Sequence, residues 1–80
     1  MHDNHVHITY APEADAAYVY LTKTELTPGR DTFPAEGPQD TDGDVLTDWR
    51  DGKLVGIEIL NASTLLHEDL LAEATPPGER

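Results

Sequence analysis

Three carboxylates stand out in this 80-residue chain because of where they lie relative to its apolar stretches. Glu13 and Asp15 fall in a turn-like segment, and Glu58 interrupts an apolar run. A general acid–base pair needs two carboxylates in different environments, one of them with a raised pKa. Turn aspartates commonly accept backbone N–H groups, and a strand glutamate can accept from tyrosine hydroxyls or a helix N-terminus. We therefore expect structural roles for Glu13, Asp15 and Glu58, with catalysis as the alternative.

Histidines near the N-terminus form a candidate metal site. His5 and His7 share one side of an alternating pattern, and two imidazoles can begin a zinc or nickel site. Such a site needs further ligands, but His2 lies in the terminal segment and His67 lies far along the chain. We expect these histidines to face solvent and the chain to hold no cofactor. The alternative is a dimer that pools its His5 and His7 pairs.

Three alternating aspartates, Asp40, Asp42 and Asp44, resemble the start of a calcium-binding loop. That loop requires glycine at its sixth position and glutamate at its twelfth, where this chain has Val45 and Asp51. We interpret the segment as an acidic turn that leads into a strand. The sequence contains no cysteine nucleophile, phosphate-binding loop, nucleophile elbow or zinc-protease helix.

The aromatic residues Tyr18, Tyr20 and Trp49 form a candidate interaction surface. They lie at strand spacing, where aromatic side chains mostly serve a core or a subunit interface, since they bury large areas. Trp49 shares a face with Val45 and Thr47. We therefore predict that Tyr18, Tyr20 and Trp49 belong to an interface.

The elements that must position these residues follow from the alternation of apolar and polar side chains. Residues 5–10 alternate, which predicts a half-buried strand. A turn at residues 11–15 leads to a second strand at 16–21, which is apolar on both faces. Such a strand is usually central and covered on both sides, so we expect a helix on one face and a subunit on the other.

A segment rich in proline and glycine, residues 22–44, predicts a loop or at best an edge strand, with brief pairing around residues 31–33. Residues 45–50 and 54–60 predict two further strands. An Asp-Gly pair separates them, and this pair between two apolar runs predicts a hairpin.

The C-terminal part predicts one helix. Asn61 or Ser63 can cap it, and capping explains Ser63 better than catalysis because no histidine adjoins it. A Pro-Pro-Gly sequence ends the helix. The order of elements predicts an α+β fold, an antiparallel sheet of about four strands with one C-terminal helix packed on one face. The helix rests on an apolar stripe: Ala62, Leu66, Leu70 and Ala74.

Length and composition narrow the functional classes. The length predicts a single compact domain at residues 5–74. We expect residues 1–4 to be frayed and residues 75–80 to form a tail. The absence of cysteine, of a signal peptide and of a membrane-length apolar run favours the cytoplasm. A net charge of −11 disfavours binding to nucleic acid or to anionic membranes. A core this small favours a homo-oligomer, most simply a dimer.

Two stretches carry a resemblance to a known family. They read Tyr-Ala-Pro-Glu-Ala-Asp-Ala-Ala-Tyr at residues 10–18 and Asp-Gly-Lys-Leu-Val-Gly-Ile-Glu-Ile-Leu-Asn-Ala-Ser at residues 51–63. This pairing resembles the domain-of-unknown-function family 2283, a group of small, mostly bacterial proteins. Ala11, Lys53 and Asn61 replace that family's usual Asp, Arg and Asp. The resemblance covers residues 5–67 except the middle, where this chain is longer and richer in proline.

The resemblance implies a compact α+β domain and supplies no catalytic residues. Members of the family resemble small antitoxin-like or accessory proteins. We therefore expect an acidic, non-enzymatic domain that acts through protein association, as a homodimer and as the partner of a basic protein. The alternative is a small enzyme or a ligand- or metal-binding protein that uses either the carboxylates or the histidine pair at a subunit interface.

Overall fold

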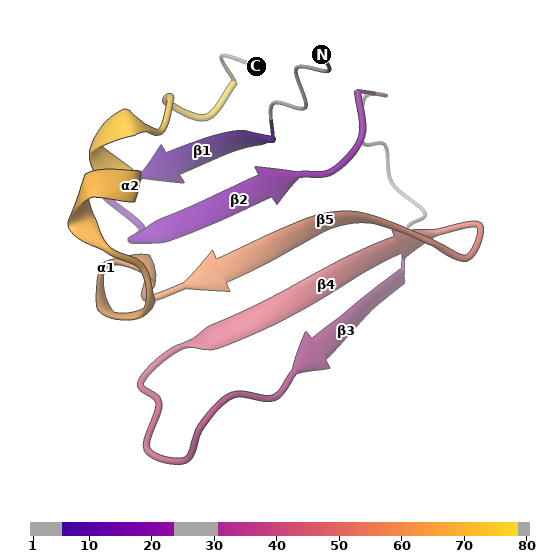
Figure 1. The fold of residues 1–80 in the computed structure, drawn as a ribbon, viewed down its shortest axis with the longest axis horizontal. Coiled ribbons are helices and arrows are strands. Elements are labelled where there is room, and N and C mark those ends of the chain that lie inside the picture. The colour runs from indigo at the N-terminus through magenta and orange to yellow at the C-terminus, as the bar shows by residue number, and fades with distance from the viewer. Residues whose placement is uncertain (1–5, 24–30, 79–80) are drawn as a thin grey trace, which may run out of the picture.

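Residues 6–23 and 31–78 are described by the structure, a computed structural model, and they form one antiparallel sheet with two short helices (Figure 1). The strands lie in the order β1-β2-β5-β4-β3, and every neighbouring pair is antiparallel. The fold is therefore α+β, as expected. The elements have these bounds: β1 His7–Ala11, β2 Ala16–Tyr20, β3 Asp31–Ala35, β4 Asp44–Arg50, β5 Lys53–Leu60, α1 Ala62–Leu65 and α2 Glu68–Glu73.

Two hairpins are joined at the middle of the sheet. The β4–β5 hairpin turns through Asp51 and Gly52, both with positive φ (51° and 78°). An Asp-Gly pair supplies this geometry in a two-residue turn, so the predicted hairpin is confirmed. The β1–β2 hairpin ends at the pair Ala11↔Ala16. Pairing of β2 with β5 unites the two hairpins and makes β5 the central strand.

Side chains alternate between two faces of the sheet. The face that carries the helices, called here the helical face, presents Ala17, Val19, Val45, Ile57 and Ile59. The opposite face, called here the tyrosine face, presents Tyr18, Tyr20, Asp48 and Glu58. The core lies under the helices, where Ala17, Ile59 and Ala62 are buried. Partly buried side chains surround these three: Tyr10, Val19, Val45, Ile57, Leu65, Leu66 and Leu71.

The sheet has one strand more than predicted. β3 pairs with β4 along its whole length, from Asp31↔Trp49 to Ala35↔Val45. The segment predicted to be a loop or at best an edge strand thus contains an edge strand, which is longer than the brief pairing predicted around residues 31–33. Pro34 is compatible with this position because β3 is an edge strand. All five residues of β3 are exposed, so the strand shows no apolar alternation.

The prediction of a single C-terminal helix is wrong. The chain forms two helices separated by Leu66 and His67, whose backbones are extended (ψ 152° and 143°). The break lets Leu65, Leu66 and Leu71 pack against the core. Leu70, which the continuous stripe would bury, is exposed instead. Neither helix in the described part of the chain is long and apolar enough to cross a membrane.

After α2 the chain returns to the edge of the sheet. Thr75 forms a parallel bridge with Thr9. The Tyr10 N–H donates to the Thr75 carbonyl over 2.9 Å, and the Thr75 N–H donates to the Ile8 carbonyl over 3.1 Å. These bonds occupy part of the outer edge of β1, which would otherwise offer unpaired backbone groups to another chain.

Candidate functional site

Asp15 connects the two sequence motifs through hydrogen bonds. It ends the β1–β2 turn with φ 50°. Its Oδ1 accepts from the Tyr10 hydroxyl over 2.7 Å and from the Ser63 N–H over 2.9 Å, and its Oδ2 accepts from the Ser63 hydroxyl over 2.7 Å. Its backbone carbonyl also accepts from the Ala62 N–H. Asp15 thus caps α1 from a position 48 residues earlier in the chain.

These contacts stabilise the charged form of Asp15. The hydrogen bond from Tyr10, followed by the two from Ser63, lowers the pKa of Asp15 below its usual value. The bond to Asp15, aided by burial and by negative charge nearby, raises the pKa of the Tyr10 hydroxyl. A general acid at neutral pH needs a raised carboxyl pKa, so this environment suits a capping carboxylate.

The side chain that caps α1 is not one of the two that the sequence predicted. The helix begins at Ala62 as predicted, and Asn61 occupies the N-cap position, but no side-chain cap bond forms there. Asn61 instead donates to the Asp42 carbonyl over 3.1 Å. The Ser63 hydroxyl donates to Asp15, so it takes part in the cap as a donor.

The other two carboxylates do not join Asp15. Glu13 is exposed in the β1–β2 turn. Glu58 is half-buried and pairs with Tyr18 and Leu46 on the tyrosine face, whereas Asp15 is bonded to α1 on the helical side of the sheet. Within the described residues, Glu13, Asp15 and Glu58 therefore form no common constellation.

Asp48 is the most buried carboxylate in the described part of the chain, at 3% exposure. Its Oδ2 accepts from the Tyr18 hydroxyl over 2.5 Å and its Oδ1 accepts from the Thr32 hydroxyl over 2.6 Å. Tyr18 reaches it by lying across Gly56, where any Cβ would collide with the tyrosine ring. This network joins β2, β3 and β4 over the central strand.

Sequence reasoning missed Asp48, Thr32 and Gly56. The one local signal was Gly56 inside an apolar strand, because glycine at such a position often marks the close approach of another group. The signal does not identify that group. Tyr18 and Asp48 are 30 residues apart, so only the register of three strands brings them together.

The histidine and aspartate candidates are separated as well. His5 lies outside the described residues. The His7 Nε2 lies 3.0 Å from the Thr75 hydroxyl, and its ring contacts Tyr20 with centroids 5.8 Å apart. Asp40, Asp42 and Asp44 are exposed. Among residues 6–23 and 31–78, no three histidine, aspartate or glutamate side chains are arranged to hold a metal ion.

The three candidate interface aromatics divide between the two faces. Tyr18 and Tyr20 stack edge to face on the tyrosine face, with centroids 4.7 Å apart. Trp49 lies on the helical face, because its indole N–H donates to the Thr47 hydroxyl over 2.9 Å and Thr47 pairs with Ile57. The three side chains therefore cannot form one continuous patch.

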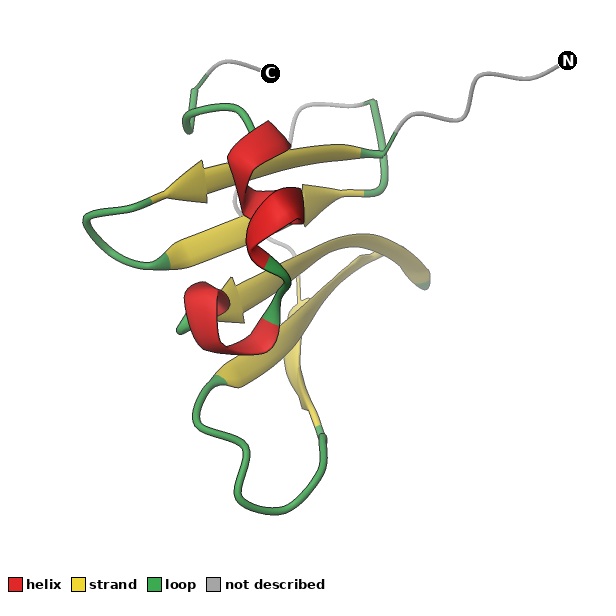
Figure 2. Ribbon diagram, turned by 60° about the vertical axis from the view of Figure 1, so that its left-hand side comes forward, coloured by secondary structure: helices red, strands yellow, loops and turns green. Residues whose placement is uncertain are grey.

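The helices leave part of the helical face uncovered (Figure 2). Both lie toward the end where β1 and β5 finish, as Figure 1 also shows. Beyond them, the large apolar side chains on this face are between 36% and 56% exposed. We call this surface the open half of the helical face: Val6, Leu21, Phe33 and Trp49.

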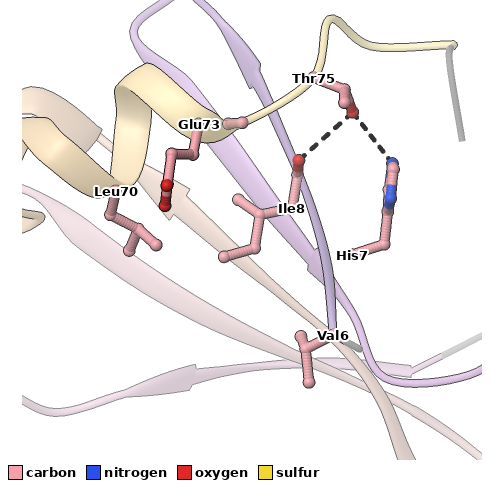
Figure 3. A pocket seen from close by; sticks show the side chains of 7 residues that line it. Val6, His7, Ile8, Leu70, Glu73 and Thr75 are labelled. Atoms are coloured by element: carbon pink, nitrogen blue, oxygen red, sulfur yellow. Dashed lines mark hydrogen bonds between the residues drawn. The ribbon is translucent and has the colours of Figure 1, made fainter. Parts of the chain in front are cut away.

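A groove of about 220 Å³ extends from the open half toward α2 (Figure 3). Val6 and Ile8 of the β1 segment line one side, and Leu70 and Glu73 of α2 line the other. In the close-up, His7 and Thr75 lie on the far side of β1 from Ile8. The groove thus has a mixed lining, with apolar side chains on both walls and the polar side chains of His7, Glu73 and Thr75 beside them.

Charge is segregated along the strand direction. All three described Lys and Arg side chains, Lys23, Arg50 and Lys53, lie at the end where β2 and β4 finish. The end that carries the helices holds most of the described carboxylates and no described Lys or Arg. These carboxylates, called here the acidic end, lie in the β1–β2 turn, the β3–β4 connection, the first residue of β4 and α2: Glu13, Asp15, Glu36, Asp40, Asp42, Asp44, Glu68, Asp69 and Glu73.

The structure therefore defines a small acidic α+β domain with a half-covered antiparallel sheet. Residues 7–63 match the family model described as "Protein of unknown function (DUF2283)". The match covers more than half of the chain, so the chain belongs to this family, as its two motifs suggested. Comparison with curated proteins and with solved structures gave no match. The matched span includes every side chain of the Asp15 and Asp48 networks.

Proposed function

We propose that this domain is a non-catalytic binding protein for a basic protein partner, with an antitoxin-like or accessory role. The segregation of charge carries the proposal. Nine described carboxylates lie at the acidic end, and no described Lys or Arg lies among them. A surface of one sign steers a partner of opposite charge and raises its association rate. The lack of cysteine fits an encounter in the reducing cytoplasm.

The hydrogen-bond networks support a binding role over a catalytic one. A catalytic carboxylate must be free to contact a substrate. Both oxygens of Asp15 and both oxygens of Asp48 already accept hydrogen bonds from the protein. Glu58 lies on the face opposite the Asp15 cap. No observation favours the small-enzyme alternative specifically.

Affinity capture from the source cell with two matched variants tests the proposal. The first variant, D40N/D42N, removes two charges from the acidic end. The second, D31N/D51N, removes two charges from the opposite end. Both pairs are exposed, and Asn tolerates the positive φ at positions 40 and 51. We expect the wild type and D31N/D51N to capture the same basic protein, identified by mass spectrometry, and D40N/D42N to capture several-fold less.

Capture should also weaken as salt rises, because an encounter between charged surfaces is screened within about 8 Å at physiological ionic strength. Two results would contradict the proposal. One is that both variants lose the partner equally. The other is that no basic protein is enriched over beads that carry an unrelated acidic domain.

A further inference from the structure

The described residues of this chain form only a small core. Among the described residues, four apolar residues are buried. Two of them are large, Val55 and Ile59, and two are small, Ala17 and Ala62. No large side chain in the described part is fully buried. Small domains usually need a further source of stability, and in a chain without cysteine a common source is oligomerisation. A partner that completes a core must always be present, and a second copy of the same chain meets that condition.

We infer that the open half of the helical face is covered by the helices of a second copy, in an antiparallel face-to-face dimer. The twofold axis of this dimer lies in the plane of the interface and runs perpendicular to the strands. Rotation about it places the helix-bearing end of each copy over the open half of the other. The helices of one chain then fill the space that the helices of its partner leave uncovered. Such an interface is isologous, so each contact occurs twice.

The apolar surfaces fit this arrangement. α2 lies toward the β1 side of the sheet (Figure 1). On that side the open half presents Val6, directly before β1, and Leu21, directly after β2. Leu70, which is 37% exposed on α2, faces the same groove as Val6. In the antiparallel dimer, Leu70 of each copy meets the groove and the Val6–Leu21 surface of the other. On the β4 side, where Leu65 of α1 approaches Gly43, α1 of the second copy would cover Phe33 and Trp49.

The charges also fit this arrangement. α2 carries Glu68, Asp69 and Glu73, and Lys23 follows β2 at the opposite end of the sheet. The antiparallel arrangement brings the acidic α2 of one copy to the Lys23 end of the other. A twofold axis parallel to the strands would instead place the helices of the two copies against each other and bring their α2 carboxylates together. Repulsion between two chains of net charge −11 opposes any dimer, but salt screens the distant part of it.

Charge reversal with sedimentation velocity tests the inference. We expect the full chain to sediment at twice its 8.8 kDa mass. K23E and E73K should each weaken the dimer about tenfold, because the symmetric interface contains the altered pair twice. The double variant K23E/E73K should recover most of the wild-type affinity. D42K is the control for E73K, since it changes net charge equally but lies in the β3–β4 connection, away from the proposed contact.

Circular dichroism will check that each variant is folded, which we expect because Lys23 and Glu73 are both exposed. A monomer at every concentration would overturn the inference, as would a dimer in which E73K and D42K act alike or in which the double variant is not restored. The proposed binding of a basic protein depends on Asp40 and Asp42. The capture experiment can therefore succeed even if the dimer test fails, and the dimer test can succeed even if the capture experiment fails.

Discussion

Asp15 shows how a residue that looks catalytic in the sequence can serve the fold. Its carboxylate joins the β1–β2 turn to the start of α1 through Tyr10 and Ser63. Each partner belongs to one of the two motifs that identify the family, so the motifs describe a structural connection. An exposed helix start would otherwise leave its N–H groups without partners.

Replacing Asp15 should lower the thermal midpoint by several degrees, since helix caps contribute measurably to the stability of small domains. We expect D15A to lose most and D15N to lose less, because the amide retains one acceptor and tolerates φ 50°. Thermal unfolding followed by circular dichroism measures both. Equal midpoints for the wild type and D15A would show that the cap contributes nothing.

The same carboxylate makes stability depend on pH. Folding lowers the pKa of Asp15 from its usual 3.8, so the unfolded chain binds this proton more tightly. The stabilisation is fully present above the pKa of the unfolded carboxyl, and it is lost as pH falls through the lower pKa of the folded protein. We expect the difference in unfolding midpoint between the wild type and D15N to shrink below about pH 4. A difference independent of pH would refute the assignment.

Gly56 should be intolerant of any side chain. Its Cβ would enter the space of the Tyr18 ring, so G56A should destabilise the fold by about 1–3 kcal/mol in urea unfolding. In a Y18A background the same substitution should cost under about 1 kcal/mol, since the ring is gone. Equal costs in both backgrounds would show that Tyr18 is not the obstacle.

At the scale of elements, residue patterns predict the strands that are partly buried. β1 alternates apolar and polar residues, β2 and β5 are apolar runs, and an Asp-Gly pair fixes the hairpin between β4 and β5. The sequence predicts β3 only as brief pairing around residues 31–33, because every residue in it is exposed and Pro34 interrupts it. β3 is recognised as a full strand only by its pairing with β4, and no pattern within residues 31–35 predicts the length of that pairing.

The helices and the two networks escape prediction for related reasons. Apolar residues four apart fit one helix or two short ones, and only the core contacts of Leu65 and Leu66 decide for two. The sequence predicts Asp15 as a hydrogen-bond acceptor in a turn, but it gives no indication of Asp48. The partners of both carboxylates escape prediction, because Ser63 and Tyr18 come near them only through the register of the sheet.

The start of α2 can be improved. His67 occupies the N-cap position with extended backbone, but its side chain makes no cap bond. H67S should stabilise the protein by about 0.5–1 kcal/mol, because a serine hydroxyl at the N-cap can accept from an N–H group of the first turn. Urea unfolding measures this gain, with H67A as the control that lacks the acceptor. If H67S is no more stable than H67A, the N-cap does not limit the stability of α2.

At the scale of the whole molecule, the two proposals assign dimerisation and partner binding to two different surfaces. In the proposed dimer, a second copy covers the open half of the helical face, and the carboxylates of the acidic end outside α2 stay available to the proposed basic partner. The β1–β2 turn and the β3–β4 connection lie outside the proposed contact between copies, so dimerisation leaves their carboxylates exposed. The tyrosine face stays internally bonded through Asp48.

Trp49 fluorescence tests the covered open half most directly, because Trp49 is the single tryptophan of the chain and is 36% exposed in one copy. A dilution series of the wild type should start with the blue-shifted emission of a buried indole and move to the red as dimers dissociate. The E73K variant should make the same change at about tenfold higher concentration. Water-exposed emission at all concentrations, identical in both proteins, would contradict the dimer.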